Sequence, residues 1–209
     1  KLNDPETEAA LKAAWVVLLS CRERYGDQVV PIGGPFHYRD VWLRDGARAI
    51  SALAVSGFTR EAMQMAEGLR LLQWPDGAFI SQRGQLDGMG QAPWAFAEVA
   101  LRRGADTTGM QAAAASAVAA WRWCERGRAM GRQAAWNGSM LMPLQDPRDN
   151  EMVRAQLVGN DAWALAGYTA AARLARAAGM TSVADSIERS RVGYAADFTA
   201  ALARSGSAD

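Results

Sequence analysis

Residues able to bind a polar ligand gather where predicted helices begin. Trp42, Arg44 and Asp45 stand at the start of one predicted helix, and Asp87 lies a few residues before another. A carboxylate and a guanidinium can together bind neighbouring hydroxyl groups, and an indole can cover the apolar face of a sugar ring. These four residues are therefore predicted to form a substrate-binding site for a sugar.

The elements that must position these residues are predicted to be helices. The chain is rich in Ala, Leu, Met and Arg and has few β-branched runs, a composition that favours helix. Apolar residues at helical spacing predict seven helices and no strand. The predicted helices span about residues 4–26, 44–56, 59–72, 93–103, 110–127, 160–177 and 181–203.

Three glycines, Gly57, Gly104 and Gly179, stand in similar settings between neighbouring predicted helices. They predict repeated helical hairpins with tight corners, separated by long and unequal loops, the longest at residues 127–158. A ring of inner and outer helices would bring those loops to a single mouth. We therefore expect an all-α fold in which residues 1–209 form one domain, a hairpin toroid.

Three motifs resemble those of the glucoamylase-like enzymes of glycoside hydrolase family 15, which belong to the six-hairpin glycosidases. Trp42-Leu43-Arg44-Asp45-Gly46-Ala47 is similar to the family's Trp-x-Arg-Asp-Gly-Ala. Gln73-Trp74-Pro75-Asp76-Gly77-Ala78-Phe79 looks like its Gln-x-Pro-Asp-Gly-x-Phe, and Gln85-Leu86-Asp87-Gly88-Met89-Gly90-Gln91 looks like its Gln-x-Asp-Gly-x-Gly-Gln. The resemblance spans most of the chain, and the motifs occur in the family's order.

The resemblance implies hydrolysis of an α-glucosidic bond with inversion, and it implies that Arg44 and Asp45 hold the sugar. The family's catalytic acid lies on the loop into the third inner helix, where this chain offers Asp146, Asp149 and Glu151. Glu151 is the preferred catalytic residue because glutamate has the higher starting pKa, which burial can raise further. The family's base lies near the end of the toroid. Seven helices make a partial toroid, so we expect the base to be missing and the chain alone to be inactive.

Other interpretations remain open. A phosphorylase or debranching relative with the same toroid would use phosphate or a branch point in place of water or a linear chain end. A non-catalytic helical module that binds a glycan or a protein is the competing class. Arg44 and Asp45 also fit an ordinary helix start with a neighbouring cation, and Asp87 followed by glycine also fits a simple turn.

Charge and hydropathy argue against nucleic acid and membrane as partners, and the partner that the resemblance implies is a carbohydrate. The chain has 23 Lys and Arg against 22 Asp and Glu, so no net field attracts nucleic acid or an anionic membrane. The longest apolar stretches are shorter than the ~20 residues of a membrane helix. The chain begins with Lys1 and shows no signal-peptide pattern, so we expect a cytoplasmic protein and a sequence excised from a longer one.

We expect neither a metal nor a cofactor. His37 is the sole histidine and no nucleophile elbow accompanies it, while Cys21 and Cys124 are far apart and are interpreted as buried thiols. The tryptophans divide into two groups by position. Those within helical stripes, assigned to the core, are Trp15, Trp121, Trp123 and Trp163. Those at or near loops, able to stack on a sugar, are Trp42, Trp74, Trp94 and Trp136.

Overall fold

The computed structural model describes residues 4–82, 84–103, 106–133, 140–145 and 154–206. Within these residues the chain is mostly helical, as predicted, with one small antiparallel sheet. The helices are α1 (Pro5–Ser20), α2 (Leu43–Val55), α3 (Thr59–Arg70), α4 (Gly88–Arg103), α5 (Thr107–Gln133), α6 (Val158–Ala177) and α7 (Thr181–Ser205). The strands are β1 (Arg22–Tyr25) and β2 (Gln28–Pro31).

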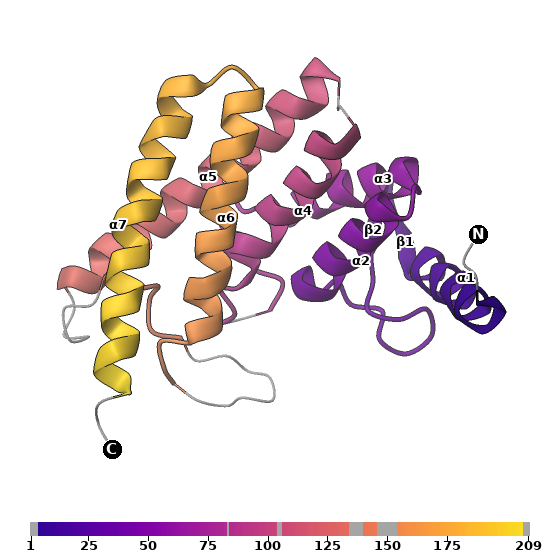
Figure 1. Cartoon of the computed structure of the whole chain (residues 1–209), viewed down its shortest axis with the longest axis horizontal. Coiled ribbons are helices and arrows are strands. Elements are labelled where there is room, and N and C mark those ends of the chain that lie inside the picture. Colours follow the sequence, from indigo (N-terminus) through magenta and orange to yellow (C-terminus); the bar gives the residue numbers. More distant parts are fainter. Residues whose placement is uncertain (1–3, 83, 104–105, 134–139, 146–153, 207–209) are drawn as a thin grey trace.

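Among the helices from α2 onward, three form a row and the other three pack on it. In this row α4 packs between α2 and α6. The remaining helices pack on this row: α3 on α2 and α4, α5 on α4 and α6, and α7 on α6 (Figure 1). Buried residues of these helices form one continuous hydrophobic core. None of the helices in the described part of the chain is long and apolar enough to cross a membrane.

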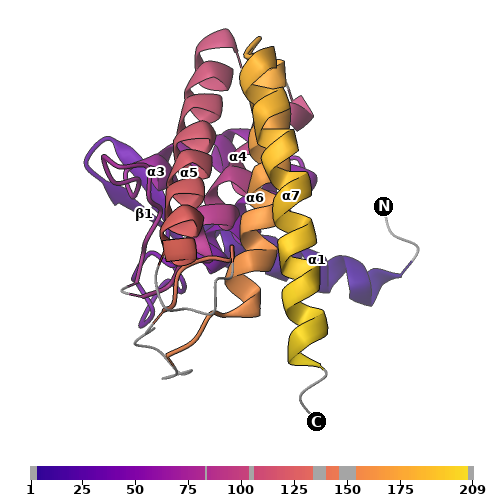
Figure 2. The ribbon, with the colours of Figure 1, turned by 90° about the vertical axis from the view of Figure 1, so that its left-hand side faces the viewer.

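Helix α1 stands apart from this body in both views (Figures 1 and 2). It has no buried residue, and Leu11 of its predicted apolar stripe is 38% exposed. Its attachment is through Trp15, whose indole N–H donates to the Ser56 hydroxyl at 2.9 Å and whose ring meets Phe58 edge-on. The predicted burial of the first helix's stripe is therefore limited to its C-terminal half.

Two of the three predicted glycine corners are present as tight turns. Gly57 and Gly179 have φ of 91° and 78°, a left-handed conformation that glycine adopts without a steric penalty. After Gly57, the N–H of Phe58 donates to the carbonyl of Leu53 at 2.9 Å, and an equivalent bond closes α6. Each corner sends the chain back against the helix it has just left. Gly104 lies outside the described residues.

Glycines bring the backbones of α4 and α6 into direct contact. A Cβ atom on Gly90 would stand 1.8 Å from the carbonyl oxygen of Trp163, and one on Gly167 would stand 2.7 Å from the Cα of Gly90. These distances are too short for any side chain, so glycine is required on both helices. The contact joins the first turn of α4 to the second and third turns of α6 and so sets the distance between the two helices near the starts of both.

The prediction of no strand is wrong at residues 22–31. The chain leaves α1 at Ser20 and forms the hairpin of β1 and β2, whose two-residue turn contains Gly26 at a φ of 59°. Gly26 was interpreted as the end of the first helix, yet it is the turn residue of this hairpin. The hairpin is held by α3, where a Cβ on Gly68 would stand 2.1 Å from the carbonyl oxygen of Val29.

Two predicted helix ends are also wrong. Helix α4 begins at Gly88 and not at Pro93, because a proline near the start of a helix removes one N–H without preventing the turn before it. Helix α5 continues through Gly127 to Gln133. Gly127 is buried, and a Cβ there would stand 3.1 Å from the ring of Pro143. This glycine therefore admits a neighbouring segment and does not end the helix.

Candidate functional site

The N-terminal ends of α2, α4 and α6 meet at one open pocket, which we call the helix-start pocket. Its volume is about 400 Å³, within the range of small-molecule sites. Its described lining consists of Arg44, Gln85, Asp87, Leu157, Val158, Gly159, Asn160 and Trp163. The convergence of these helix starts follows from the row α2–α4–α6 and from the parallel sense of alternate helices in a chain of hairpins.

An ion pair joins two helix starts across this pocket. Nε of Arg44 donates to Oδ2 of Asp87 at 3.1 Å, although 43 residues separate them. The same Oδ2 accepts a hydrogen bond from Nε2 of Gln91 at 2.8 Å. Gln91 is fully buried, so the amide holds Asp87 from inside the protein while Arg44 approaches from the exposed side.

Helix α6 supplies an amide and an indole. Asn160 is 4% exposed, and among the described residues its Nδ2 has no hydrogen-bond partner. Trp163 is half-buried and meets Trp94 edge-on, with ring centroids 5.7 Å apart. An edge-on contact fixes the plane of an indole. The pocket therefore combines a guanidinium, a carboxylate, two amides and a held aromatic ring.

These groups suit a neutral ligand that carries several hydroxyl groups. The cation and the anion lie next to each other, so the pocket presents both a strong donor and a strong acceptor within a few ångströms. The positive ends of the helix dipoles also favour ligand oxygens. An aromatic ring beside such a pair offers an apolar surface to the C–H face of a sugar.

The structure brings together two of the four predicted substrate-binding residues. Arg44 and Asp87 share the helix-start pocket. Trp42 is not part of the described lining, and its ring stacks on Tyr38 at 5.5 Å with an interplanar angle of 17°. Asp45 is exposed in the first turn of α2, also outside that lining. The predicted catalytic residue Glu151 lies outside the described residues, as do Asp146, Asp149 and Trp136.

Sequence reasoning missed the site positions of Trp163 and Asn160. Trp163 was assigned to the core because it continues an apolar stripe, yet it lies on the second turn of α6, where the stripe reaches the pocket. The sequence places Asn160 at the start of a predicted helix, a role that asparagine fills without any ligand. The sequence signal that could have found both residues is their position. They lie within the first two turns of α6, whose start belongs to the same row as the helix starts that carry Arg44 and Asp87.

Beside the pocket, Asp161 is a buried carboxylic acid. It is 1% exposed, and burial raises its pKa above the ordinary aspartate value of 3.8. The opposing causes are the hydrogen bonds that its Oδ1 accepts from the Met142 N–H and the Tyr194 hydroxyl, together with the charge of Arg128. Asp161 lines a second depression, between the start of α6 and the end of α7, which shares Val158 with the helix-start pocket.

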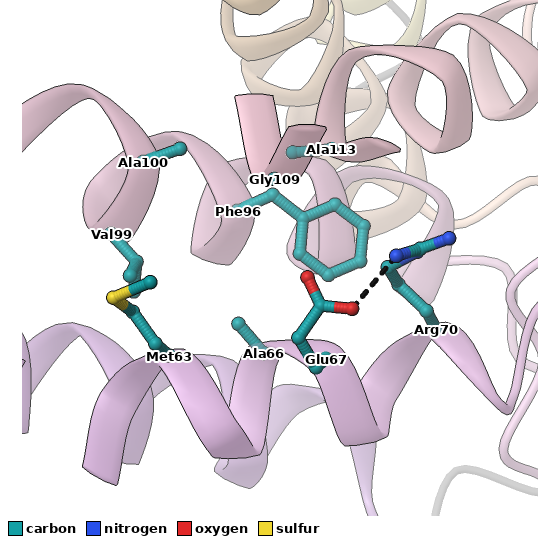
Figure 3. Close-up of a pocket in the computed structure, with 9 residues that line it drawn as sticks. All are labelled: Met63, Ala66, Glu67, Arg70, Phe96, Val99, Ala100, Gly109 and Ala113. Carbon is teal, nitrogen blue, oxygen red and sulfur yellow. Dashed lines mark hydrogen bonds and ion pairs between the residues drawn. The ribbon is translucent and has the colours of Figure 1, made fainter. Parts of the chain in front are cut away.

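A third depression, between α3, α4 and α5, lacks the chemistry of a polar site. Figure 3 shows Met63 and Phe96 facing this recess, and the ion pair of Glu67 with Arg70, 2.7 Å apart, on α3. The remaining lining is aliphatic or glycine, and the empty space is about 360 Å³. Its full lining is Met63, Ala66, Glu67, Arg70, Phe96, Val99, Ala100, Gly109 and Ala113.

The cysteines and acids of the described residues show no metal-binding arrangement. No group of three or more His, Cys, Asp or Glu side chains in the described ranges is placed to hold a metal ion. Cys21 and Cys124 are buried free thiols, as predicted, and burial raises the pKa of both.

Comparisons with protein-family models, curated proteins and solved structures found no match to this chain.

Proposed function

We propose that the helix-start pocket binds a sugar residue and that the protein is a glycoside hydrolase of the glucoamylase-like type, acting on an α-glucosidic bond. The observation that carries the proposal is the Arg44–Asp87 pair, drawn from the starts of α2 and α4 into one pocket with Trp163 of α6. A bound sugar would exchange hydrogen bonds with the pair through two neighbouring hydroxyl groups. Its apolar face would lie against the indole.

The helix arrangement supports a partial toroid. The row α2–α4–α6 corresponds to inner helices, and α3, α5 and α7 correspond to outer ones, each following its inner partner in a hairpin. In such a ring the loops before the inner helices form one mouth. The helix-start pocket stands at the ends of α2, α4 and α6 where that mouth would be.

Cleavage with inversion needs two carboxyl groups on opposite faces of the sugar. One donates a proton to the glycosidic oxygen as the C–O bond breaks, and the other takes a proton from the attacking water. Glu151 is our proposed acid, on the grounds given by the sequence. Asp87 serves binding in this proposal, because its oxygen is already engaged by Arg44 and Gln91.

The second candidate is a sugar-binding module without turnover. One observation favours it: Asp87 is the only carboxylate in the described lining of the helix-start pocket. Inversion requires two carboxyl groups roughly 6.5 to 9.5 Å apart with room for water between them. The two candidates share the binding step, so binding is tested first.

The binding test titrates the purified chain with maltotriose by calorimetry. We expect Asp87→Asn to weaken binding at least tenfold, because a charged acceptor becomes an amide, while the free energy of unfolding changes by less than ~1 kcal/mol. The matched control is Glu98→Gln. Glu98 pairs with Arg102 at side-chain exposures of 16% and 49%, close to the 14% and 44% of Asp87 and Arg44.

Three outcomes of this titration contradict the proposal. They are no binding by the unmodified chain, an equal loss in Glu98→Gln, and a loss in Asp87→Asn that matches a loss of folded protein. Asp45→Ala in the same titration tests the role implied by the resemblance. That role predicts a tenfold weaker affinity, whereas an ordinary helix-start residue outside the described lining predicts an unchanged affinity. In both cases the thermal transition should stay the same, since Asp45 is exposed and makes no part of the core.

A further inference from the structure

The rim of the helix-start pocket is a short segment, and the residues on either side of it both bond the backbone of Met142. Residues 157–160 line the pocket. On the near side, Nε2 of Gln156 donates to the carbonyl oxygen of Met142 at 3.0 Å. On the far side, the N–H of Met142 donates to Oδ1 of Asp161 at 2.8 Å. The residues that flank the rim therefore grip the two polar groups of Met142.

A tyrosine of α7 also bonds Asp161. The hydroxyl of Tyr194 donates to the same Oδ1 at 2.6 Å, and both side chains are essentially inaccessible, at 0% and 1% exposed. A buried carboxylate oxygen that accepts two hydrogen bonds is held in one orientation, because leaving either donor unpaired would be costly. Asp161 follows the pocket residue Asn160 directly in α6.

The segment that contains Met142 is itself anchored to the body of the protein. Nε of Arg128, on α5, donates to the carbonyl oxygen of Met140 at 2.6 Å. The Arg128 guanidinium also bonds Glu125 at 2.7 Å and Asp197 of α7 at 2.9 Å, and it lies 3.7 Å from the ring centroid of Tyr194. Arg128 is 4% exposed, and its charge is paired on two sides. Such a network has few alternative arrangements.

We propose that Asp161 and Tyr194 act as positioning residues that hold the pocket rim, residues 157–160, in the shape that accepts a sugar. The inference rests on the proposed sugar-binding function. Two residues of the rim are exposed: Val158 is 55% exposed and Gly159 is exposed. Residues 158–160 are the first residues of α6, so the rim moves with the start of that helix. Gln156 and Asp161 fix this start against Met142, next to the backbone bridge between Gln145 and Ala155.

A neighbouring tyrosine provides a matched control. Tyr168 is as buried as Tyr194, its ring centroid lies 5.4 Å away, and its hydroxyl donates to Glu125 at 2.7 Å. Tyr168→Phe therefore removes one buried hydroxyl from the same cluster without touching the bonds to Met142. A purely structural role predicts equal effects of Tyr168→Phe and Tyr194→Phe.

The first readout is the affinity for maltotriose, measured well below the thermal transition of every variant. We expect Tyr194→Phe to weaken binding about fivefold and Asp161→Ala at least tenfold. Asp161→Asn should stay within twofold of the unmodified chain, because its amide oxygen still accepts from Met142. Tyr168→Phe should also stay within twofold, even where its thermal transition falls as far as that of Tyr194→Phe. Equal losses in the two tyrosine variants would overturn the proposal.

The second readout needs no sugar. Hydrogen exchange at the Met142 amide should speed up in Tyr194→Phe and Asp161→Ala, and it should remain unchanged in Tyr168→Phe. If exchange responds in this selective way but the unmodified chain binds no maltotriose, the proposed function fails while the grip on Met142 stands. If exchange is the same in both tyrosine variants, the positioning role fails whatever the sugar affinity.

Discussion

Arg44 and Asp87 show why residue type alone leaves a site undecided. Each is also explained as part of a helix start, and an exposed ion pair of this kind contributes only ~0 to 1 kcal/mol to stability. What distinguishes this pair is its location, with Gln91 behind it and Trp163 beside it in one pocket. The pair is thus weak evidence for a stabilising contact and stronger evidence for a ligand-binding one.

The raised pKa of Asp161 leads to a prediction of how the stability of the fold depends on pH. Its folded pKa is raised, so the folded state binds the proton more tightly than the unfolded state does. This contribution to stability is complete below the unfolded pKa of about 3.8 and is lost as pH rises through the folded pKa. Asp161→Asn imitates the protonated form, so we expect the variant to be more stable than the unmodified chain at pH 7.

The measurement is urea unfolding of both proteins between pH 3 and pH 8. The difference in the free energy of unfolding should shrink as pH falls toward the unfolded pKa, because the unmodified chain then carries a protonated Asp161 too. A variant that is less stable at pH 7, by an amount that does not depend on pH, would show that the charged form is the one the fold prefers.

At the scale of elements, the contact between α4 and α6 determines the pocket. Gly90→Ala would place a Cβ 1.8 Å from the carbonyl oxygen of Trp163, and rigid backbone on both sides leaves no side chain to move. We expect a loss of at least ~2 kcal/mol in the free energy of unfolding, at the upper end of typical overpacking costs. The variant should also bind maltotriose more weakly, because relief of the clash moves the first turns of α6.

Gly193→Ala is the control for this prediction, measured by the same urea unfolding. Gly193 lies inside α7, and a Cβ there meets nothing within 4 Å. The substitution should increase the free energy of unfolding by ~0.5 to 1 kcal/mol through helix propensity alone. If Gly90→Ala behaved like Gly193→Ala, the close approach of α4 and α6 would not exist in solution.

Element boundaries were predictable where local rules act alone. The corners at Gly57 and Gly179 follow from the need for a left-handed residue after a helix, and the structure has both. The start of α4 and the end of α5 could not be predicted in this way. Gly88, Gly90 and Gly127 lie there because neighbouring segments come too close for a larger residue. A glycine that ends a helix and a glycine that admits a neighbour look the same in a sequence.

At the scale of the whole molecule, the second candidate, a sugar-binding module, predicts binding without turnover. Asp87 is the sole carboxylate among the described residues that line the helix-start pocket, and inversion needs two. We expect the 209-residue chain to release no reducing sugar from maltooligosaccharides or trehalose, with or without inorganic phosphate. The assay compares folded protein with a blank over a range of pH.

Two kinds of turnover would each correct a different part of this expectation. Hydrolysis that disappears in Glu151→Gln would show that both carboxyl groups are already present. Turnover that requires phosphate and yields a sugar phosphate would favour the phosphorylase alternative. The unmodified chain and the Glu151→Gln variant would be compared at equal folded concentration.

The sequence by itself determined the helical class and the two tight corners, because periodicity and capping are local properties. It also predicted that Arg44 and Asp87 meet, from the convergence of alternate helix starts in a chain of hairpins. Tertiary structure alone decided that Trp163 and Asn160 join them and that Trp42 stacks on Tyr38. It also decided that Asp161 accepts hydrogen bonds from both the Met142 N–H and the Tyr194 hydroxyl. The physical reason is that these contacts join residues on different elements, whose separation depends on how closely the backbones of α4 and α6 can approach.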